Sequence, residues 1–338
     1  MSQDIFVVPQ WTRNTIVESG SRLEFHIIYR CVDQCIFCSE ETSMKRLKGM
    51  IVPREDVLSM LEKKRKEGFE HVTLTGGEPT FYPKFWEIAA FAKNLGYRVF
   101  VISNGWGLSQ PEFAEKLLPY IDELCLSIHG PNKEIHDKLT RTEGSFEKLM
   151  GAFKNVEAHP ARHWVQVNHV VTRHNVSYLP KTLELFSRNK KLCQFLVSNV
   201  TPHGGARHNY KELAVQHKEI TSQIPTLVKI AHIRRVSLRF YGIPVCLLGP
   251  YWRYSNDLFF SPRTTIAKTT QDNGSVDWLF ERAPYSYREK FFPKVCDSCV
   301  LKGRCGGIYF PYTQIFGDEN LKPFTPKSLR ELSVPPIN

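Results

Sequence analysis

The feature that most constrains the fold is an alternation of short β-branched runs with longer helical patterns between Glu24 and Asn199. The strand-like runs are EFHIIY (24–29), HVTL (71–74), RVFVIS (98–103), ELCLSI (123–128), WVQVNHVV (164–171) and QFLVSNV (194–200). Several of the helix-like segments between them begin with proline or acidic residues and end at glycine. Repeated units of this length predict parallel strands joined by right-handed crossovers. We therefore expect an α/β fold, a partial (β/α)6 barrel with functional loops at the carboxyl ends of its strands.

The pattern changes after Pro202. A helical stretch and one more strand-like run, RRVSLRF, lead to about residue 240. From Tyr241 onward the periodicity fades into a segment rich in proline, glycine and aromatic residues, which is too long for a structureless loop unless a metal centre organises it. We predict an N-terminal extension (1–22), a TIM-like partial barrel (23–240), an irregular C-terminal domain (241–325) and a tail (326–338).

Composition indicates a soluble, cytoplasmic protein. The 338-residue chain has no apolar run close to the roughly 20 residues that a membrane-spanning helix needs, and its N-terminus lacks the pattern of a signal peptide. Its nine cysteines are not expected to form disulfides in a reducing cytosol, so their clustering points to metal binding or catalysis. Cys125 and Cys193 stand alone in strand-like runs and are expected to be small buried side chains.

Three cysteines follow the first strand in the segment CVDQCIFC: Cys31, Cys35 and Cys38. A structural zinc site normally has four protein ligands, and the next cysteine or histidine along the chain is His71. Thiolates suit iron-sulfur clusters, and a cubane cluster held by three of them leaves one iron open to an external ligand. The missing fourth ligand therefore indicates a place for a substrate or cofactor, although the triplet by itself could also serve zinc.

A second motif, VTLTGGEPTFYP (72–83), follows the second strand. Its paired glycines permit a tight turn close to a ligand, and Pro79 stiffens the exit. The CX3CX2C triplet with Phe37 before its last cysteine, together with Gly76, Gly77, Glu78 and Pro79, resembles the signature of the radical S-adenosylmethionine (SAM) superfamily. This resemblance implies a SAM-binding 4Fe-4S cluster, SAM as cofactor, and a GGEP element that binds the ammonium of its methionyl part.

The resemblance also implies cofactor contacts at later strand ends. These fall on Ser103 and Asn104 of VISNG, Ser127 and His129 of LSIHG, and Asn168 of VNHVV. Arg141, in IHDKLTRTEGSF, is placed to meet a carboxylate and lies in a stretch similar to one found in peptide-modifying members. For each of these residues, satisfying nearby backbone groups is an alternative explanation.

The remaining cysteine group is in the C-terminal region. Cys296, Cys299 and Cys305 have CX2CX5C spacing, and Cys246 follows the last predicted strand. This arrangement resembles the SPASM domain or its shorter variant, twitch, which carry auxiliary 4Fe-4S clusters. Tyr309 occupies the place where a full SPASM domain would have a further cysteine, so we predict one auxiliary cluster. A zinc knot made by the same four thiolates is the alternative.

The resemblance implies an enzyme that reductively cleaves SAM to a 5′-deoxyadenosyl radical, which abstracts hydrogen from a substrate. The catalytic residues that act on the substrate are unknown. We expect oxidative modification of a ribosomally made peptide because of the twitch-like tail, the IHDKLTRTEGSF stretch and the net charge of +11, which suits an acidic peptide partner. A flavodoxin- or ferredoxin-type protein is the expected reductant.

Other functions remain open. One is radical modification of a small sugar, amino acid or nucleoside intermediate. Another, of a different class, is a non-catalytic iron-sulfur or zinc sensor. No basic-aromatic stripe is recognisable, so nucleic acid is not a favoured partner, and no membrane partner is expected.

Overall fold

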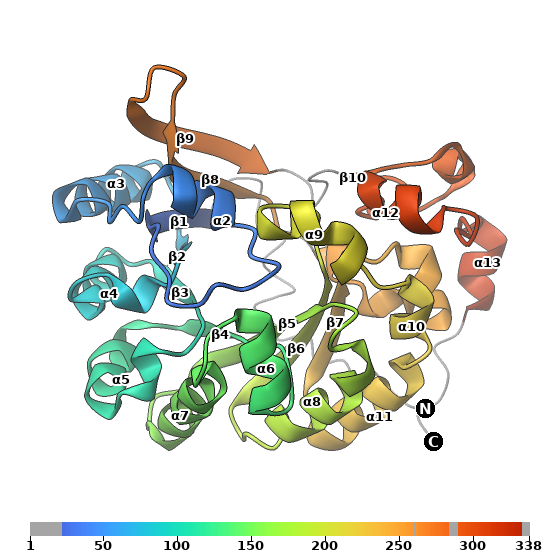
Figure 1. Ribbon diagram of the computed structural model, residues 1–338, viewed down its shortest axis with the longest axis horizontal. Helices are drawn as coiled ribbons and strands as arrows, with labels where there is room; N and C mark the ends of the chain where they lie inside the picture. The colour runs from blue at the N-terminus through green and yellow to red at the C-terminus, as the bar shows by residue number, and fades with distance from the viewer. Residues whose placement is uncertain (1–21, 260, 284–289, 333–338) are drawn as a thin grey trace.

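The computed structural model describes residues 22–259, 261–283 and 290–332. They form a mixed α/β fold around a largely parallel sheet with the order β7-β6-β5-β4-β3-β2-β1-β8-β9 (Figure 1). The strands are β1 (Arg22–Ile28), β2 (His71–Gly76), β3 (Arg98–Ser103), β4 (Glu123–Ser127), β5 (Trp164–Val171), β6 (Leu192–Asn199), β7 (Ser237–Tyr241), β8 (Arg263–Thr270) and β9 (Val276–Ala283). β1 to β7 are parallel and neighbour one another in chain order, as right-handed β-helix-β units require.

The helices between the strands cover the sheet. In Figure 1, α3, α4, α5, α7, α8 and α11 follow one another in an arc outside the sheet. The helices up to β7 are α2 (Glu41–Arg46), α3 (Arg54–Lys66), α4 (Phe85–Asn94), α5 (Pro111–Leu117), α6 (Lys133–Thr140), α7 (Ser145–Ala158), α8 (Leu179–Phe186), α9 (Gly205–Leu213), α10 (His217–Thr221) and α11 (Ile224–Arg234). The apolar faces of α3, α4, α5, α7, α8, α10 and α11 share one main hydrophobic core with the strands, whereas α6 and α9 pack in a second cluster.

The six strands expected from the sequence correspond to β1 to β6, and the additional run RRVSLRF forms β7. The segment from Glu134 to Ala158 forms two helices, because Arg141 ends α6 and Gly144 precedes α7, both with left-handed backbone angles. The stretch from Thr201 to Ile233 likewise contains three helices instead of one continuous pattern. Counting six units therefore undercounts the parallel strands, and the partial barrel stays a prediction.

The C-terminal region contributes to the main sheet, which the sequence did not indicate. β8 pairs in parallel with β1, and β9 pairs with β8 in a hairpin that projects at the upper left of Figure 1. The rest of this region comprises η5 (Val245–Tyr254), η6 (Asn256–Phe259), β10 (Lys290–Phe291), η7 (Lys294–Ser298), β11 (Ile308–Tyr309), α12 (Phe310–Phe316) and α13 (Pro326–Glu331). The predicted division at residue 241 thus separates segments that share one sheet, and the four-part division stays a prediction.

Most of the predicted N-terminal extension and the end of the predicted tail lie outside the described residues. Arg22, the last residue of that predicted extension, begins β1. Among the described residues, no helix is both long and apolar enough to cross a membrane.

Candidate functional site

The first cysteine loop, residues 31–38, is held by the end of helix α6. The backbone N–H of Gln34 donates to the carbonyl of Thr140 (2.9 Å), and that of Ile36 donates to the carbonyl of Leu139 (3.0 Å). The last carbonyls of a helix have no partner within the helix, so the loop satisfies groups that would otherwise need water or a cap. The cysteine loop is therefore fixed by the fold independently of any bound metal.

The glycines of the GGEP motif pack directly on the backbone that leads into this loop. A Cβ on Gly76 would lie 2.2 Å from the carbonyl oxygen of Ile28, and a Cβ on Gly77 would lie 2.3 Å from that of Arg30. Backbone hydrogen bonds run from Gly77 to Ile28 (2.7 Å) and from Glu78 to Arg30 (2.9 Å). Only glycine allows this approach, so the motif positions the residue that immediately precedes Cys31.

The three thiols of the loop lie in one another's electrostatic range. Burial raises the pKa of Cys31, Cys35 and Cys38, that of Cys38 to about 11, and each thiol's pKa is raised further by nearby acidic groups. Cys31 and Cys35 each also feel the charge of Cys38. A thiolate set of this kind suits a positively charged metal centre, because the metal replaces the protons that burial favours. These donors therefore fit an iron-sulfur cluster.

Glu78 is the centre of a buried hydrogen-bond network. Its side chain accepts bonds from the N–H (3.1 Å) and hydroxyl (2.6 Å) of Thr80, from the hydroxyl of Ser103 (2.7 Å) and from the N–H of Asn104 (2.7 Å). Burial raises its pKa, and these hydrogen bonds oppose the rise. With 1% exposure, the carboxylate is directed into the protein. It joins the ends of β2 and β3.

This network reaches the cysteine loop at two points. The side-chain amide of Asn104 donates to the sulfur of Cys31 (3.7 Å), and the indole N–H of Trp106 donates to Asp33 (2.9 Å). Sequence reasoning missed Asp33, Thr80 and Trp106. The position of Asp33 between two predicted ligands was the one available signal. Burial raises the pKa of Asp33 to about 7, with a further contribution from Glu78.

Phe37 and His129, both predicted to bind the cofactor, contact each other. Their ring centroids are 4.6 Å apart in an edge-on arrangement, and His129 is 3% exposed. The backbone N–H of His129 donates to the ring of His136 (3.2 Å), and the two imidazoles stack. Burial keeps the pKa of His129 well below its usual value, so the imidazole is neutral at pH 7.

The other predicted cofactor residues differ in their placement. Ser127 and Asn168 are register partners on β4 and β5, and the side-chain oxygen of Asn168 accepts from Ser198 (2.6 Å). Arg141 is exposed at the end of α6, but the hydroxyl of its neighbour Thr142 donates to the backbone of Val32 in the cysteine loop (3.4 Å). Their roles in binding SAM stay predictions.

A second glycine pair, missed by the sequence analysis, closes over the far end of the cysteine loop. Gly204 has left-handed backbone angles, and a Cβ there would lie 2.3 Å from the carbonyl oxygen of Cys38. The N–H of Gly205 donates to the same oxygen (2.9 Å). The Gly-Gly sequence after a predicted strand was a signal for such a close approach.

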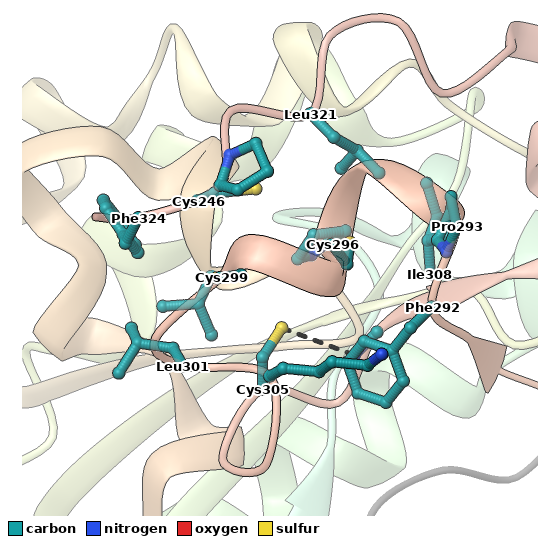
Figure 2. Close-up of a pocket in the computed structure, with 15 residues that line it drawn as sticks. Cys246, Phe292, Pro293, Cys296, Cys299, Leu301, Cys305, Ile308, Leu321 and Phe324 are labelled. Atoms are coloured by element: carbon teal, nitrogen blue, oxygen red, sulfur yellow. Dashed lines mark hydrogen bonds between the residues drawn. The ribbon is translucent and has the colours of Figure 1, made fainter.

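The four C-terminal cysteines line one pocket (Figure 2). Its empty volume is about 390 Å³ with the open mouth included, and its walls include Cys246, Cys296, Cys299 and Cys305. Burial raises the pKa of Cys246 and of Cys296 to about 11, and each is raised further by neighbouring cysteines of the group. The N–H of Gly307 donates to the sulfur of Cys305 (3.4 Å), which is the dashed contact in Figure 2. The distant Cys246 thus lines the same pocket as the CX2CX5C segment, and its role as a cluster ligand stays a prediction.

All nine cysteines are free thiols; Cys125 is buried in β4 as expected, whereas Cys193 is only partly buried in β6. Within the part of the chain that the structure describes, no three His, Cys, Asp or Glu side chains are drawn together tightly enough for a single metal ion. The two cysteine groups are therefore recognised by their spacing and shared surroundings, without a closed coordination shell.

Comparison with known proteins agrees with this geometry. Residues 25–186 match the family model described as the Radical SAM superfamily. An S-adenosylmethionine-dependent nucleotide dehydratase of Flammeovirga pacifica is 26% identical, over 62% of this chain and 72% of the relative. A PqqA peptide cyclase of Rhizobium meliloti is 24% identical, over 82% of this chain and 78% of the relative.

The solved structures include Streptococcus suis SuiB bound to S-adenosylmethionine, with a TM-score of 0.55 and 17% identity over 79% of this chain. This chain spans 62% of the length of that SuiB chain, and the likeness shows a shared fold. The match at residues 25–186 contains both the cysteine triplet and the GGEP motif. Residues 25–186 therefore form a radical SAM superfamily domain, a kind of domain that uses a 4Fe-4S cluster and SAM, and the chain is an enzyme.

Proposed function

We propose that this enzyme oxidatively modifies a side chain of a ribosomally made peptide, with one SAM-binding cluster and one auxiliary 4Fe-4S cluster. The observation that carries the proposal is the presence of two separate cysteine groups in one chain: the triplet at the end of β1 and the four thiols around a C-terminal pocket. Cys31, Cys35 and Cys38 would hold a 4Fe-4S cluster that, once reduced, would supply one electron to SAM and so split it into methionine and a 5′-deoxyadenosyl radical.

In this proposal, the chain's own residues bind and orient the cofactors. Cys31, Cys35 and Cys38 hold the first cluster through three of its irons. Glu78 fixes the ends of β2 and β3 against each other, because it accepts hydrogen bonds from Thr80 on one side and from Ser103 and Asn104 on the other. These strand ends would hold the methionyl part of SAM. Phe37 and His129 form an apolar, uncharged wall that excludes water from the reacting atoms.

The C-terminal cysteines hold the auxiliary cluster in a twitch-like domain. The pocket fits this role because four sulfurs line one cavity whose other walls are mainly apolar, including Phe292, Leu301 and Phe324. A largely apolar shell controls solvent access to a cluster and so its potential. The cluster would supply a place for the electron released when the substrate is oxidised.

A peptide substrate is supported by two observations. The PqqA peptide cyclase aligns with 82% of this chain. A second SuiB structure, bound to the precursor peptide SuiA, aligns with 88% of this chain at a TM-score of 0.57. The net charge of +11 favours an acidic partner. A flavodoxin- or ferredoxin-type protein would supply the reducing electron.

A second candidate function is radical modification of a nucleotide. It is supported by the nucleotide dehydratase of Flammeovirga pacifica, which aligns over 72% of its own length. Nucleoside phosphates are acidic as well, so the net charge does not distinguish them from peptides. The two candidates differ in the substrate that the enzyme modifies after SAM is cleaved, which is a peptide in one case and a nucleotide in the other.

The experiment is anaerobic reconstitution followed by reduction with dithionite in the presence of SAM. We expect about eight irons per chain and formation of 5′-deoxyadenosine. Replacing Cys31, Cys35 and Cys38 with alanine should abolish this cleavage, whereas replacing Cys296 and Cys299 should leave part of it and halve the iron. If the second change removes no iron, the auxiliary cluster is refuted.

Substrate class is then tested by mass spectrometry. The enzyme is incubated with SAM and either candidate precursor peptides or nucleoside triphosphates. A peptide product with a loss of hydrogen supports peptide oxidation, and a modified nucleotide with unmodified peptides supports the second candidate instead.

A further inference from the structure

A buried ion pair lies next to the C-terminal cysteine pocket. Lys290 begins β10, and its Nζ is 3.8 Å from Oδ2 of Asp257 in η6, with both side chains 1% exposed. Taking two charges out of water is costly, and apolar residues of similar size often give equal or better stability. A buried pair at this place is therefore weak as a purely stabilising feature.

The surroundings of Lys290 are aromatic. Its Nζ lies 4.7 Å from the ring centre of Tyr241 and 5.1 Å from that of Tyr309, which allows cation–π attraction to both. No hydrogen-bond acceptor for Nζ is found among the described residues. The ammonium is therefore in a region of low dielectric constant, where its charge acts on neighbouring groups with little screening.

Gly306 connects this pair to the cysteine group. A Cβ at this position would lie 2.4 Å from the Asp257 carboxylate and 2.8 Å from Nζ of Lys290, so both charged atoms touch the residue that follows Cys305. Both charges are therefore close enough to act on the Cys305 sulfur.

We infer that Lys290 and Asp257 are positioning residues that set the reduction potential of the auxiliary cluster, an inference that rests on the proposed function. Reduction adds one electron to the cluster, so a nearby positive charge favours the reduced form and a nearby negative charge opposes it. The potentials of iron-sulfur clusters depend on local charge, hydrogen bonds to sulfur and solvent exposure. Here the two charges act from the Cys305 side with opposite signs.

The test uses the full chain with Cys31, Cys35 and Cys38 replaced by alanine, so that the auxiliary cluster is the only one present. This protein is reconstituted anaerobically, and its one-electron reduction by dithionite is followed by electron paramagnetic resonance at controlled potentials. We expect Lys290→Gln to shift the midpoint to a lower potential and Asp257→Asn to shift it to a higher one. Midpoints unchanged in both variants would overturn the inference.

Lys302→Gln is the matched control. Lys302 also lines the cysteine pocket, but its ammonium is exposed and bonded to Asp297 (2.7 Å), so solvent screens its charge and the midpoint should move much less. Lys290→Arg keeps the buried charge and should keep the wild-type midpoint.

Iron content separates the possible failures. If the alanine background binds no iron, the auxiliary cluster of the proposed function is refuted, and this inference falls with it. The midpoint potential is expected to shift in opposite directions in the two single variants, and each shift is a separate test. One variant that binds iron is therefore sufficient. Loss of iron in both, with iron retained in Lys290→Arg, would show that the pair is structural and would overturn the inference.

Discussion

Gly77→Ala tests whether the GGEP turn positions the first cysteine loop. The added Cβ would lie 2.3 Å from the carbonyl oxygen and 2.6 Å from the carbonyl carbon of Arg30, both of which are backbone atoms that cannot rotate away. Ordinary contact begins near 3.4 Å, so one strand end has to move by about 1 Å. Gly77 does not have a left-handed φ, so the effect is steric and not conformational.

The cost follows from two contributions. Overpacking of this kind costs about 1–3 kcal/mol. The displacement also weakens the hydrogen bonds from Gly77 to Ile28 and from Glu78 to Arg30, each worth about 1 kcal/mol. We therefore expect the free energy of unfolding to fall by about 2–4 kcal/mol. Because Cys31 follows Arg30 directly, the first cluster should also be lost, and iron per chain should fall by about half.

The assays are urea unfolding and iron analysis of the anaerobically reconstituted protein. Gly303→Ala is the control, because that glycine has no left-handed φ and no atom within 4 Å of its Cβ position. It should change the free energy of unfolding by less than about 0.5 kcal/mol and leave the iron content unchanged. If Gly77→Ala behaves like this control, the close approach of the GGEP turn to Arg30 does not constrain the cysteine loop.

Three further predictions use the same measurements. Glu78→Gln should lower the free energy of unfolding by about 1–3 kcal/mol, because an NH₂ group that cannot accept a hydrogen bond replaces one of the two accepting oxygens. Glu87→Gln, at a partly exposed carboxylate, should change it by under about 1 kcal/mol, and equal effects would contradict the network. Gly204→Ala should lose the iron of the first cluster, because its Cβ would lie 2.3 Å from the carbonyl oxygen of Cys38. Gly274→Ala should keep that iron, because Gly274 also has a positive φ but has open space around its Cβ position. Iron loss in both variants would point to backbone strain alone. Burial lowers the pKa of His169 to about 3, so this imidazole stays neutral in the folded protein at pH 5 and above. The unfolded chain binds a proton at this histidine below about pH 6.5, so the stability present above pH 6.5 is lost as the pH falls. Between pH 6.5 and 5, the free energy of unfolding should therefore fall by about 2 kcal/mol less in His169→Phe than in the wild-type protein. An equal slope of unfolding free energy against pH in the two proteins would contradict this.

The parts of the fold that the sequence predicted are those encoded locally. The six strands between Glu24 and Val200 were visible because β-branched runs alternate with helical patterns, and β1 to β6 occupy those positions. The β8–β9 hairpin was missed because RTTIAKTT is mostly polar, and because β8 pairs with β1, more than two hundred residues earlier in the chain. Pairing at such a separation leaves no periodic signal in the sequence.

The same distinction applies to the candidate site. The motifs identified the cysteines and Glu78 by spacing, but they did not show that the Glu78 carboxylate is turned inward toward Ser103 and Asn104, since that depends on the register of β2 and β3. Lys290 and Asp257 gave no signal, because they meet only through the packing of β10 and η6 against Gly306.

One buried cluster connects the two cysteine groups physically. Phe37 from the first loop packs in the same apolar cluster as Tyr210, Tyr309 and Tyr312, and Cys35 and Cys296 lie against that cluster from opposite segments of the chain. Packed interiors transmit displacement, because few voids are available to absorb it. We therefore expect a displacement at either cysteine group to shift the aromatic side chains that both groups contact. Tyr309, whose ring also faces Lys290, lies where this packing meets the charge that we propose tunes the auxiliary cluster.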